Sequence, residues 1–310
     1  MVFEYKPIEF TETRRIELPK HPISRKAWLD KSMNKIVSLL ERKVLHIKED
    51  LEIYESTYEA PIKTEYDENN TGRVRYYKAS DESAVIVLPQ RGSGVNIAQI
   101  VASYLATNGI SAYEIETPFH GSRLPIGVRS ITEIPFDLNK LKIIFTQAVT
   151  ETRSLIDLIE EKNIGIFGVS LGGVYASLVY GIDDRVVSAC LALAGGNFSD
   201  MIFESNERFM LYLRKHIIKD GISKEELIEK LKEVEPSNYT NPAKSDNLLF
   251  VTASNDKSIP IKYSQQLRDA WGYPEQYLVN AGHITSIKEI KPLLSKVLLH
   301  YRRTLGPFSL

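Results

Sequence analysis

Residues 164–173 read Ile-Gly-Ile-Phe-Gly-Val-Ser-Leu-Gly-Gly, an apolar run that ends in a serine with glycines on either side. The run 164–169 is short and continuously apolar, which is typical of a strand buried on both faces of a parallel sheet. The turn from a strand directly into a helix strains the backbone, so it needs small neighbours such as Gly168 and Gly172. This segment therefore predicts a strand, a sharp turn that exposes Ser170, and a helix.

Similar apolar runs recur along the chain and alternate with segments of helical period. The runs bounded by glycine or proline lie at 84–88, 110–115, 164–169, 186–194 and 248–251. Segments 96–108 and 137–160 place their apolar residues along one helical stripe. Strands that alternate with helices favour βαβ units. The predicted fold class is therefore α/β, with a mainly parallel sheet flanked by helices.

Two regions depart from this alternation. Residues 197–244 separate two predicted strands by far more chain than a crossover requires, and they contain a helical segment at 201–218 and a capping box of Ser223 with Glu226. We interpret 197–244 as a helical cap inserted in a core that spans 81–310. Residues 1–80 are expected to form an N-terminal extension packed on that core. It would contain a polar arm over 1–24, a helix over 25–48, and an antiparallel hairpin from 51–58 and 73–78.

The composition excludes several classes of protein. The chain has 310 residues, and its 39 Lys and Arg nearly balance 40 Asp and Glu, so no net field favours nucleic acid. No window approaches the ~20 apolar residues of a membrane span, and the acidic N-terminus does not resemble a signal peptide. The single cysteine, Cys190, lies in an apolar run and is expected to be a buried core residue. Without a disulfide framework, we expect a soluble, cytoplasmic protein.

Two polar residues follow later strands, as Ser170 follows its own. Asp256 comes after the run 248–251, and His283 comes after a short strand predicted at 277–279. A serine hydroxyl needs a base to take its proton, and the base needs a carboxylate to fix its tautomer. Because ligands of open α/β sheets collect at the carboxyl ends of the strands, we expect these three residues to converge. Each also has an ordinary interpretation, as a helix start, a turn residue and a surface histidine, and Asp200 is a weaker candidate for the acid.

These motifs together resemble the α/β-hydrolase superfamily over about residues 80–305. The matching pieces are the turn at Ser170, the Asn-Asp loop at Asp256, the Gly-His at His283, and the segment 116–123, similar to the loop after the fourth strand of many members. The resemblance implies a catalytic triad of Ser170 as nucleophile, Asp256 as acid and His283 as base, with acyl transfer to water through an acyl-enzyme. It implies no cofactor. His120, within 116–123, is expected to hold the turn rather than bind substrate or metal.

The predicted oxyanion hole departs from the common pattern of the superfamily. The backbone N–H of Leu171, directly after the nucleophile, is the first expected donor. The second should come from the loop after 84–88, where many relatives carry His-Gly and this chain reads Pro-Gln-Arg-Gly-Ser-Gly over 89–94. We predict the backbone N–H of Arg91, with Gln90 as the close alternative, and we expect the Arg91 side chain to be solvated.

The sequence therefore predicts a serine hydrolase of the esterase type that cleaves a carboxylic ester, or a related acyl bond, of a small molecule. Thioesterases, peptidases and lipases share this fold, and a non-catalytic protein that binds a small ligand on the same scaffold is the alternative outside enzymes. The aromatic and Met residues of the cap are candidates for pocket lining and equally for packing: Phe203, Phe209, Met210 and Tyr212. No metal site is predicted, because the remaining histidines show no ligand spacing: His21, His46, His216 and His300.

Overall fold

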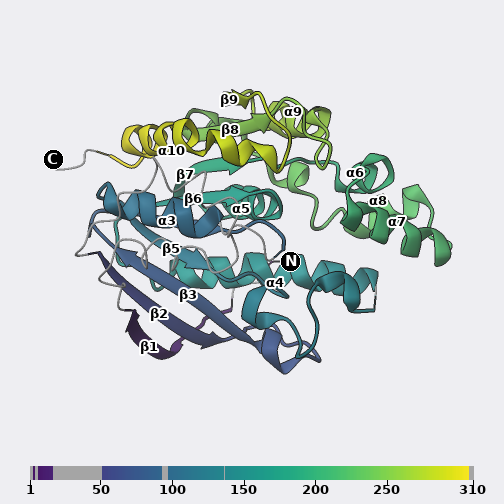
Figure 1. Ribbon diagram of the computed structural model, residues 1–310, viewed down its shortest axis with the longest axis horizontal. Coiled ribbons are helices and arrows are strands. Elements are labelled where there is room, and N and C mark those ends of the chain that lie inside the picture. Colours follow the sequence, from purple (N-terminus) through teal and green to yellow (C-terminus); the bar gives the residue numbers. More distant parts are fainter. Residues whose placement is uncertain (1–2, 4–5, 17–50, 93–96, 136, 307–310) are drawn as a thin grey trace.

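A computed structural model of the protein describes residues 3, 6–16, 51–92, 97–135 and 137–306 (Figure 1). Its strands form one nine-stranded sheet in the order β1-β2-β3-β5-β4-β6-β7-β8-β9. The strands are β1 Phe10–Ile16, β2 Glu52–Glu59, β3 Thr71–Lys78, β4 Ser83–Leu88, β5 Ser111–Ile115, β6 Asn163–Val169, β7 Val186–Ala192, β8 Leu248–Ala253 and β9 Glu275–Val279. The helix predicted at 25–48, with His21 and His46, lies outside the described residues.

The sheet is mainly parallel, as the sequence predicts. Every neighbouring pair from β5 and β4 through to β8 and β9 runs parallel. The predicted hairpin is also confirmed, because β2 and β3 pair antiparallel along their whole length. β3 then pairs antiparallel with β5, so β1–β3 continue the same sheet. The division of the chain at residue 80 stays a prediction.

Helices cover both faces of the sheet. They are α3 Ile97–Thr107, α4 Leu138–Ile156, α5 Leu171–Ile182, α9 Ile261–Ala270 and α10 Ile290–Thr304, with short 3-10 turns η1 Asp67–Asn70, η2 Gly121–Arg123, η3 Ile131–Glu133, η4 Pro236–Tyr239, η5 Pro242–Asn247 and η6 Thr285–Glu289. The apolar residues of α4, α5 and α9 pack in one core cluster and those of α3 and α10 in another. Alternate residues of β4 enter the two clusters, which is why this strand reads as a continuous apolar run.

Three helices lie between β7 and β8, at the right of the view in Figure 1: α6 Phe198–Glu204, α7 Arg208–Lys219 and α8 Lys224–Leu231. The capping box is confirmed, because the Ser223 side chain accepts a hydrogen bond from the backbone N–H of Glu226. The single helical segment expected at 201–218 is wrong. The chain breaks before Glu207, whose carboxylate accepts from the N–H groups of Phe209 and Met210 and so starts α7 anew.

Strand β1 is a second departure, because the sequence predicts only a polar arm there. Its residues Phe-Thr-Glu-Thr-Arg-Arg-Ile carry almost no apolar alternation, and all but the last are exposed. The strand is instead held by backbone pairing with β2 and by polar cross-strand contacts. The hydroxyls of Thr13 and Ser56 lie 2.8 Å apart, and Arg14 pairs with Glu55 at 2.5 Å. A strand stabilised by its neighbour's polar groups leaves little trace in its own hydropathy.

Cys190 is fully buried in β7, as expected, and burial raises the pKa of its thiol. None of the helices in the described ranges has the length and apolar character needed to cross a membrane.

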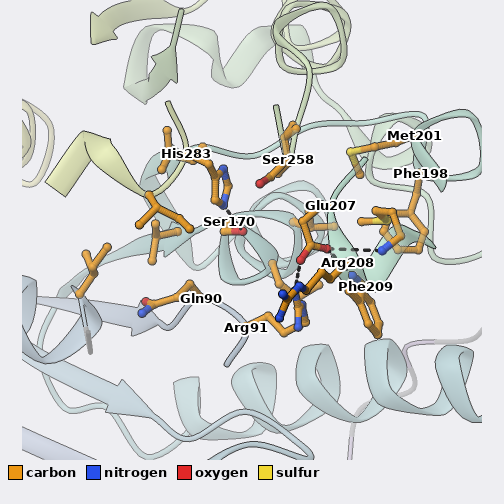
Figure 2. Close-up of a pocket in the computed structure, with 18 of the residues that line it drawn as sticks. Gln90, Arg91, Ser170, Phe198, Met201, Glu207, Arg208, Phe209, Ser258 and His283 are labelled. Atoms are coloured by element: carbon orange, nitrogen blue, oxygen red, sulfur yellow. Dashed lines mark hydrogen bonds and ion pairs between the residues drawn. The ribbon is translucent and has the colours of Figure 1, made fainter. Parts of the chain in front are cut away.

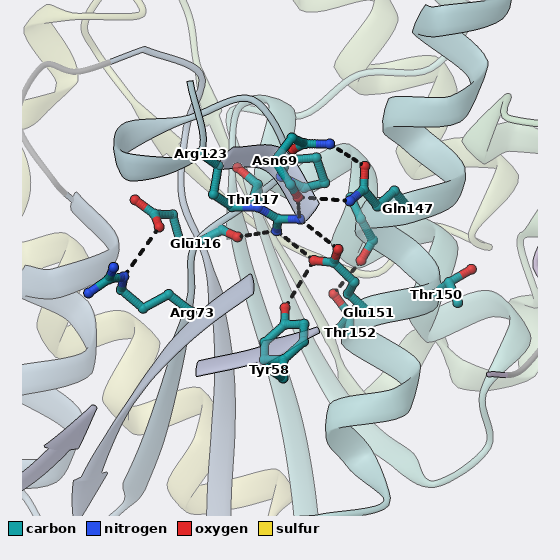
Figure 3. A network of polar contacts seen from close by, with 12 residues as sticks. Tyr58, Asn69, Arg73, Glu116, Thr117, Arg123, Gln147, Thr150, Glu151 and Thr152 are labelled. Atoms are coloured by element: carbon teal, nitrogen blue, oxygen red, sulfur yellow. Dashed lines mark hydrogen bonds and ion pairs between the residues drawn. The ribbon is translucent and has the colours of Figure 1, made fainter. Parts of the chain in front are cut away.

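A buried ion pair ties the loop after β5 to α4 and to the β2–β3 connection (Figure 3). The Arg123 guanidinium donates to both carboxylate oxygens of Glu151, at 2.6 and 2.7 Å, and neither side chain is exposed to solvent. Arg123 also donates to the backbone carbonyls of Glu116 and Asn69, and Tyr58 donates to Glu151. These extra hydrogen bonds satisfy groups that burial would otherwise leave without water, so the pair fixes the loop in place.

We predict that Arg123→Met lowers the free energy of unfolding by about 3–5 kcal/mol, because it leaves the Glu151 carboxylate buried without its partner. Urea denaturation of the purified protein measures this change. The matched control is Lys162→Met, which removes an exposed pair with Glu82 and should change stability by under about 1 kcal/mol. Equal effects of the two substitutions would contradict the structural role of Arg123.

Candidate active site

Ser170 occupies a strained turn between β6 and α5. Its φ is +55° and its ψ is −119°, a conformation that residues other than glycine rarely adopt. A Cβ on Gly168 would lie 2.1 Å from the Gly172 carbonyl oxygen, and a Cβ on Gly172 would lie 2.4 Å from the Leu88 carbonyl oxygen. The two glycines therefore allow the turn to close on itself and let the start of α5 approach the end of β4. The strand, turn and helix predicted at 164–173 are confirmed.

The structure brings the side chains of Ser170, His283 and Asp256 together from three separate strand ends. His283 Nε2 lies 2.9 Å from Ser170 Oγ, and His283 Nδ1 lies 2.6 Å from Asp256 Oδ2. The other Asp256 oxygen, Oδ1, accepts hydrogen bonds from the backbone N–H groups of Ser258 and Ile259 at 2.8 and 2.9 Å. This loop follows β8 and His283 follows β9, so the parallel topology sets the convergence.

The hydrogen bonds also fix the tautomer of the imidazole. A carboxylate oxygen only accepts, so Nδ1 of His283 carries the hydrogen and donates it to Asp256. Nε2 of the neutral ring then has a lone pair, and the Ser170 hydroxyl donates to it. The arrangement can therefore take a proton from Ser170 and stabilise the imidazolium that forms.

Two backbone segments meet beside Ser170. Leu171 is the first residue of α5, where a backbone N–H has no partner within the helix. Arg91 follows β4, and both residues line the same cavity as Ser170. The solvated side chain expected for Arg91 is wrong: its Nη2 lies 2.7 Å from Glu207 Oε1, and its guanidinium lies 4.6 Å from the centre of the Phe209 ring (Figure 2). Residues 93–96 of this loop lie outside the described residues.

A cavity of about 580 Å³ opens beside Ser170 and His283 (Figure 2). Its walls come from the strand ends and from α6 and α7, and they are mainly apolar: Val169, Val174, Leu193, Phe198, Met201, Phe209, Met210, Ile259, Ile284 and Ile287. Of the sequence candidates, Phe209 and Met210 line this cavity, whereas Phe203 and Tyr212 do not. Phe198 and Met201 also line the cavity, and they were not among the sequence candidates. Their spacing of three residues, which places both on one face of a helix, could have indicated this.

The remaining candidates lie apart from this site. The Asp200 carboxylate pairs with Lys224 at 2.8 Å, and Asp256 supplies the carboxylate beside His283. His216 Nδ1 donates to the Tyr212 carbonyl. His300 is buried, which lowers the pKa of its imidazole to about 4. Within the described ranges, no cluster of His, Cys, Asp or Glu is suited to hold a metal ion.

Comparison with known proteins agrees with the fold. The chain belongs to the α/β-hydrolase superfamily. Within it, residues 86–199 match the family described as "Alpha/beta hydrolase domain containing 18", a segment that runs from the second half of β4 through β7 and includes Ser170. The chain is also 30% identical over 94 residues to the Bacillus subtilis (strain 168) protein described as "Uncharacterized protein YdjC". That match covers 30% of this chain and 81% of the relative.

Solved structures show the same architecture at low sequence identity. An acetyl xylan esterase from Paenibacillus sp. R4 aligns with a TM-score of 0.60 at 15% identity, over 95% of this chain and 98% of that one. Acetyl xylan esterase 1 from Thermoanaerobacterium sp. JW/SL YS485 aligns with a TM-score of 0.61 at 11% identity, over 84% and 87% of the two chains. At these identities the likeness concerns the fold alone.

We predict that Gly172→Ala destabilises the protein by about 1–3 kcal/mol, because the added methyl group meets the backbone of the β4 loop and forces it to move. Thermal or urea unfolding measures the loss. Gln265→Ala, on the exposed face of α9, serves as a control and should change stability by under about 0.5 kcal/mol. Unchanged stability of Gly172→Ala would show that β4 and α5 do not approach as closely as described.

Proposed function

We propose that the protein is a serine hydrolase that cleaves the carboxylic ester of a small molecule. Ser170 acts as nucleophile, His283 as general base and Asp256 as the acid that orients it. The observation that carries this proposal is the continuous pair of hydrogen bonds from Ser170 Oγ through the imidazole to Asp256, at 2.9 and 2.6 Å. A nucleophile, a base and an orienting group in hydrogen-bond contact are the signature of an activated serine.

The proposed reaction has two stages. His283 takes the Ser170 proton while Ser170 Oγ forms a bond to the ester carbonyl carbon, and collapse of the tetrahedral intermediate breaks the bond to the alcohol oxygen. That oxygen receives the proton from His283 and leaves as the alcohol. In the second stage His283 takes a proton from water, whose oxygen forms a bond to the acyl carbon. The bond to Ser170 Oγ then breaks, His283 returns the proton to Oγ, and the carboxylic acid leaves. The net change is one ester and one water converted to an acid and an alcohol.

The negative charge on the intermediate needs two donors. We propose the backbone N–H of Leu171, which also lies at the N-terminus of α5, and the backbone N–H of Arg91, with Gln90 as the alternative. The proximity of the β4 loop to Gly172 supports this assignment, because it brings the two segments to one side of Ser170. The ion pair of Arg91 with Glu207, at the start of α7, also holds the loop after β4 in place.

We further propose that residues 197–244 act as a cap that shapes the substrate site, and that residues 1–80 form an extension of the core. Side chains of α6 and α7 in the wall of the cavity support the cap. The apolar character of that wall favours a hydrocarbon acyl group as the part of the substrate bound there. A cytoplasmic location is proposed because Cys190, the single cysteine, is a free and buried thiol.

The test is covalent labelling with a fluorophosphonate, followed by assay on ester substrates. We expect the native protein to be labelled and to hydrolyse 4-nitrophenyl butyrate, and Ser170→Ala to lose both, with kcat/KM reduced by at least about 10³-fold. The control is Ser295→Ala, an exposed serine on α10 that should leave both intact. Absence of labelling in the native protein would favour a small-ligand-binding protein, and faster turnover of matched thioesters or amides would favour a thioesterase or peptidase.

Asp256→Asn should lower kcat by about 10³–10⁴-fold without unfolding the protein. Because Oδ1 accepts from two backbone N–H groups, the asparagine oxygen takes that place and its NH₂ group faces His283 Nδ1. The imidazole must then carry its hydrogen on Nε2, where it no longer accepts the Ser170 proton. Steady-state kinetics together with a melting curve measure the effect. Asp246→Asn, an exposed aspartate, is the matched control, and an equal loss of activity in it would refute the specific role of Asp256.

A further inference from the structure

A second cleft of about 260 Å³ lies at the carboxyl ends of β4 and β5. It is lined by residues after β4, by the end of β5 and the loop that follows it, and by Arg73 and Arg75 of β3. Gln90 lines both this cleft and the cavity that contains Ser170. The two hollows therefore share one wall residue, which is the neighbour of the proposed oxyanion donor Arg91.

The charged groups of this cleft are already paired with one another. Arg73 lies 2.8 Å from Glu55 and 3.7 Å from Glu116, a contact drawn in Figure 3. Arg75 lies 3.0 Å from Glu55 and 3.8 Å from Glu114. A ligand with its own net charge would have to compete with these pairs, so the cleft does not favour an ionic group.

His120 lines this cleft and carries a buried acceptor. Its Nδ1 lies 2.8 Å from the Pro118 carbonyl oxygen, and a carbonyl only accepts, so Nδ1 carries the hydrogen. Burial lowers the pKa of this imidazole to about 4, with the charges of Arg91 and Arg123 acting in the same direction, so the ring is neutral near pH 7. Nε2 is then a bare acceptor. It is buried and has no hydrogen-bond partner among the described residues.

A complementary donor lines the same cleft. Arg73 Nε is also buried; it lies 3.7 Å from Glu116 Oε2 in the ion pair described above, but it makes no hydrogen bond among the described residues. One acceptor and one donor with no hydrogen-bond partner suit hydroxyl groups, which both donate and accept, better than any group that does only one. The loop that carries His120 is held rigidly, because Phe119 donates to Asn69 and the buried Arg123 donates to the Glu116 carbonyl. These contacts hold the loop in place independently of any ligand.

We propose that this cleft binds the alcohol portion of the substrate through its hydroxyl groups, while the apolar cavity holds the acyl chain. This inference rests on the proposed hydrolase function and names its substrate class: an ester between a hydrocarbon acid and a polyhydroxylated alcohol. It assigns His120 a role in substrate binding, whereas the sequence predicts only that this residue holds its turn. Ester cleavage then releases the polyol past Gln90.

The experiment compares glycerol 1-monobutyrate with ethyl butyrate, which share an acyl group and differ in the hydroxyls of the alcohol. We expect the native protein to prefer the glycerol ester by at least about tenfold in kcat/KM, since a site built to pair hydroxyls disfavours the analogue that lacks them. His120→Phe should reduce that preference about tenfold, chiefly through a higher KM for the glycerol ester. The matched control is His216→Phe, outside both cavities, which should keep the native preference.

A melting curve shows whether His120→Phe is folded. A second variant tests the proposal independently of that result. Arg73→Met removes the donor from a side chain that is 32% exposed, and Glu55 keeps its contacts with Arg14 and Arg75. It should reduce the same preference. Equal kcat/KM for the two esters in the native protein, or an unchanged preference in both variants with fluorophosphonate labelling intact, would overturn the polyol site alone. Loss of labelling and of all ester hydrolysis in the native protein would overturn the proposed function itself.

Discussion

The backbone of Ser170 is held in a conformation that a serine does not adopt by preference, and the rest of the site is arranged around that constraint. The strain persists because β6 is fixed by hydrogen bonds to β4 and β7, and because α5 begins immediately after the turn. Gly168 and Gly172 remove the side chains that would obstruct the turn. As a result the Ser170 hydroxyl stands above the sheet edge, where the loops after β8 and β9 also end.

The loop after β5 depends on a different interaction, the buried pair of Arg123 and Glu151. Removing two charges from water is unfavourable, and the pair is tolerated because Tyr58 and the Asn69 and Glu116 carbonyls supply further hydrogen bonds to it. These partners come from β2, from the connection before β3 and from the end of β5. A single guanidinium thus joins the antiparallel part of the sheet to the parallel part. This network also holds the loop that carries His120 and lines the polar cleft.

Short-range patterns in the sequence predicted much of the fold and of the candidate site. The apolar runs predicted the parallel strands, and the order of Ser170, Asp256 and His283 at three strand ends predicted that their side chains would meet, which the structure shows. Part of what the sequence did not reveal depends on partners far along the chain, as the polar strand β1 depends on its pairing with β2. The break before α7 is local: Glu207 caps the N–H groups two and three residues further on, but acidic residues are common in such segments and this one was not recognised as a cap. The ion pair of Arg91 with Glu207 likewise joins residues far apart in the sequence, so the sequence did not predict it.

Glu207 performs two tasks with one carboxylate. One oxygen caps α7, and the other holds Arg91 on the loop beside Ser170. If α7 moves away from the sheet while the loop stays in place, the ion pair of Arg91 with Glu207 is broken. One carboxylate therefore couples the position of this helix to the position of the loop beside the nucleophile.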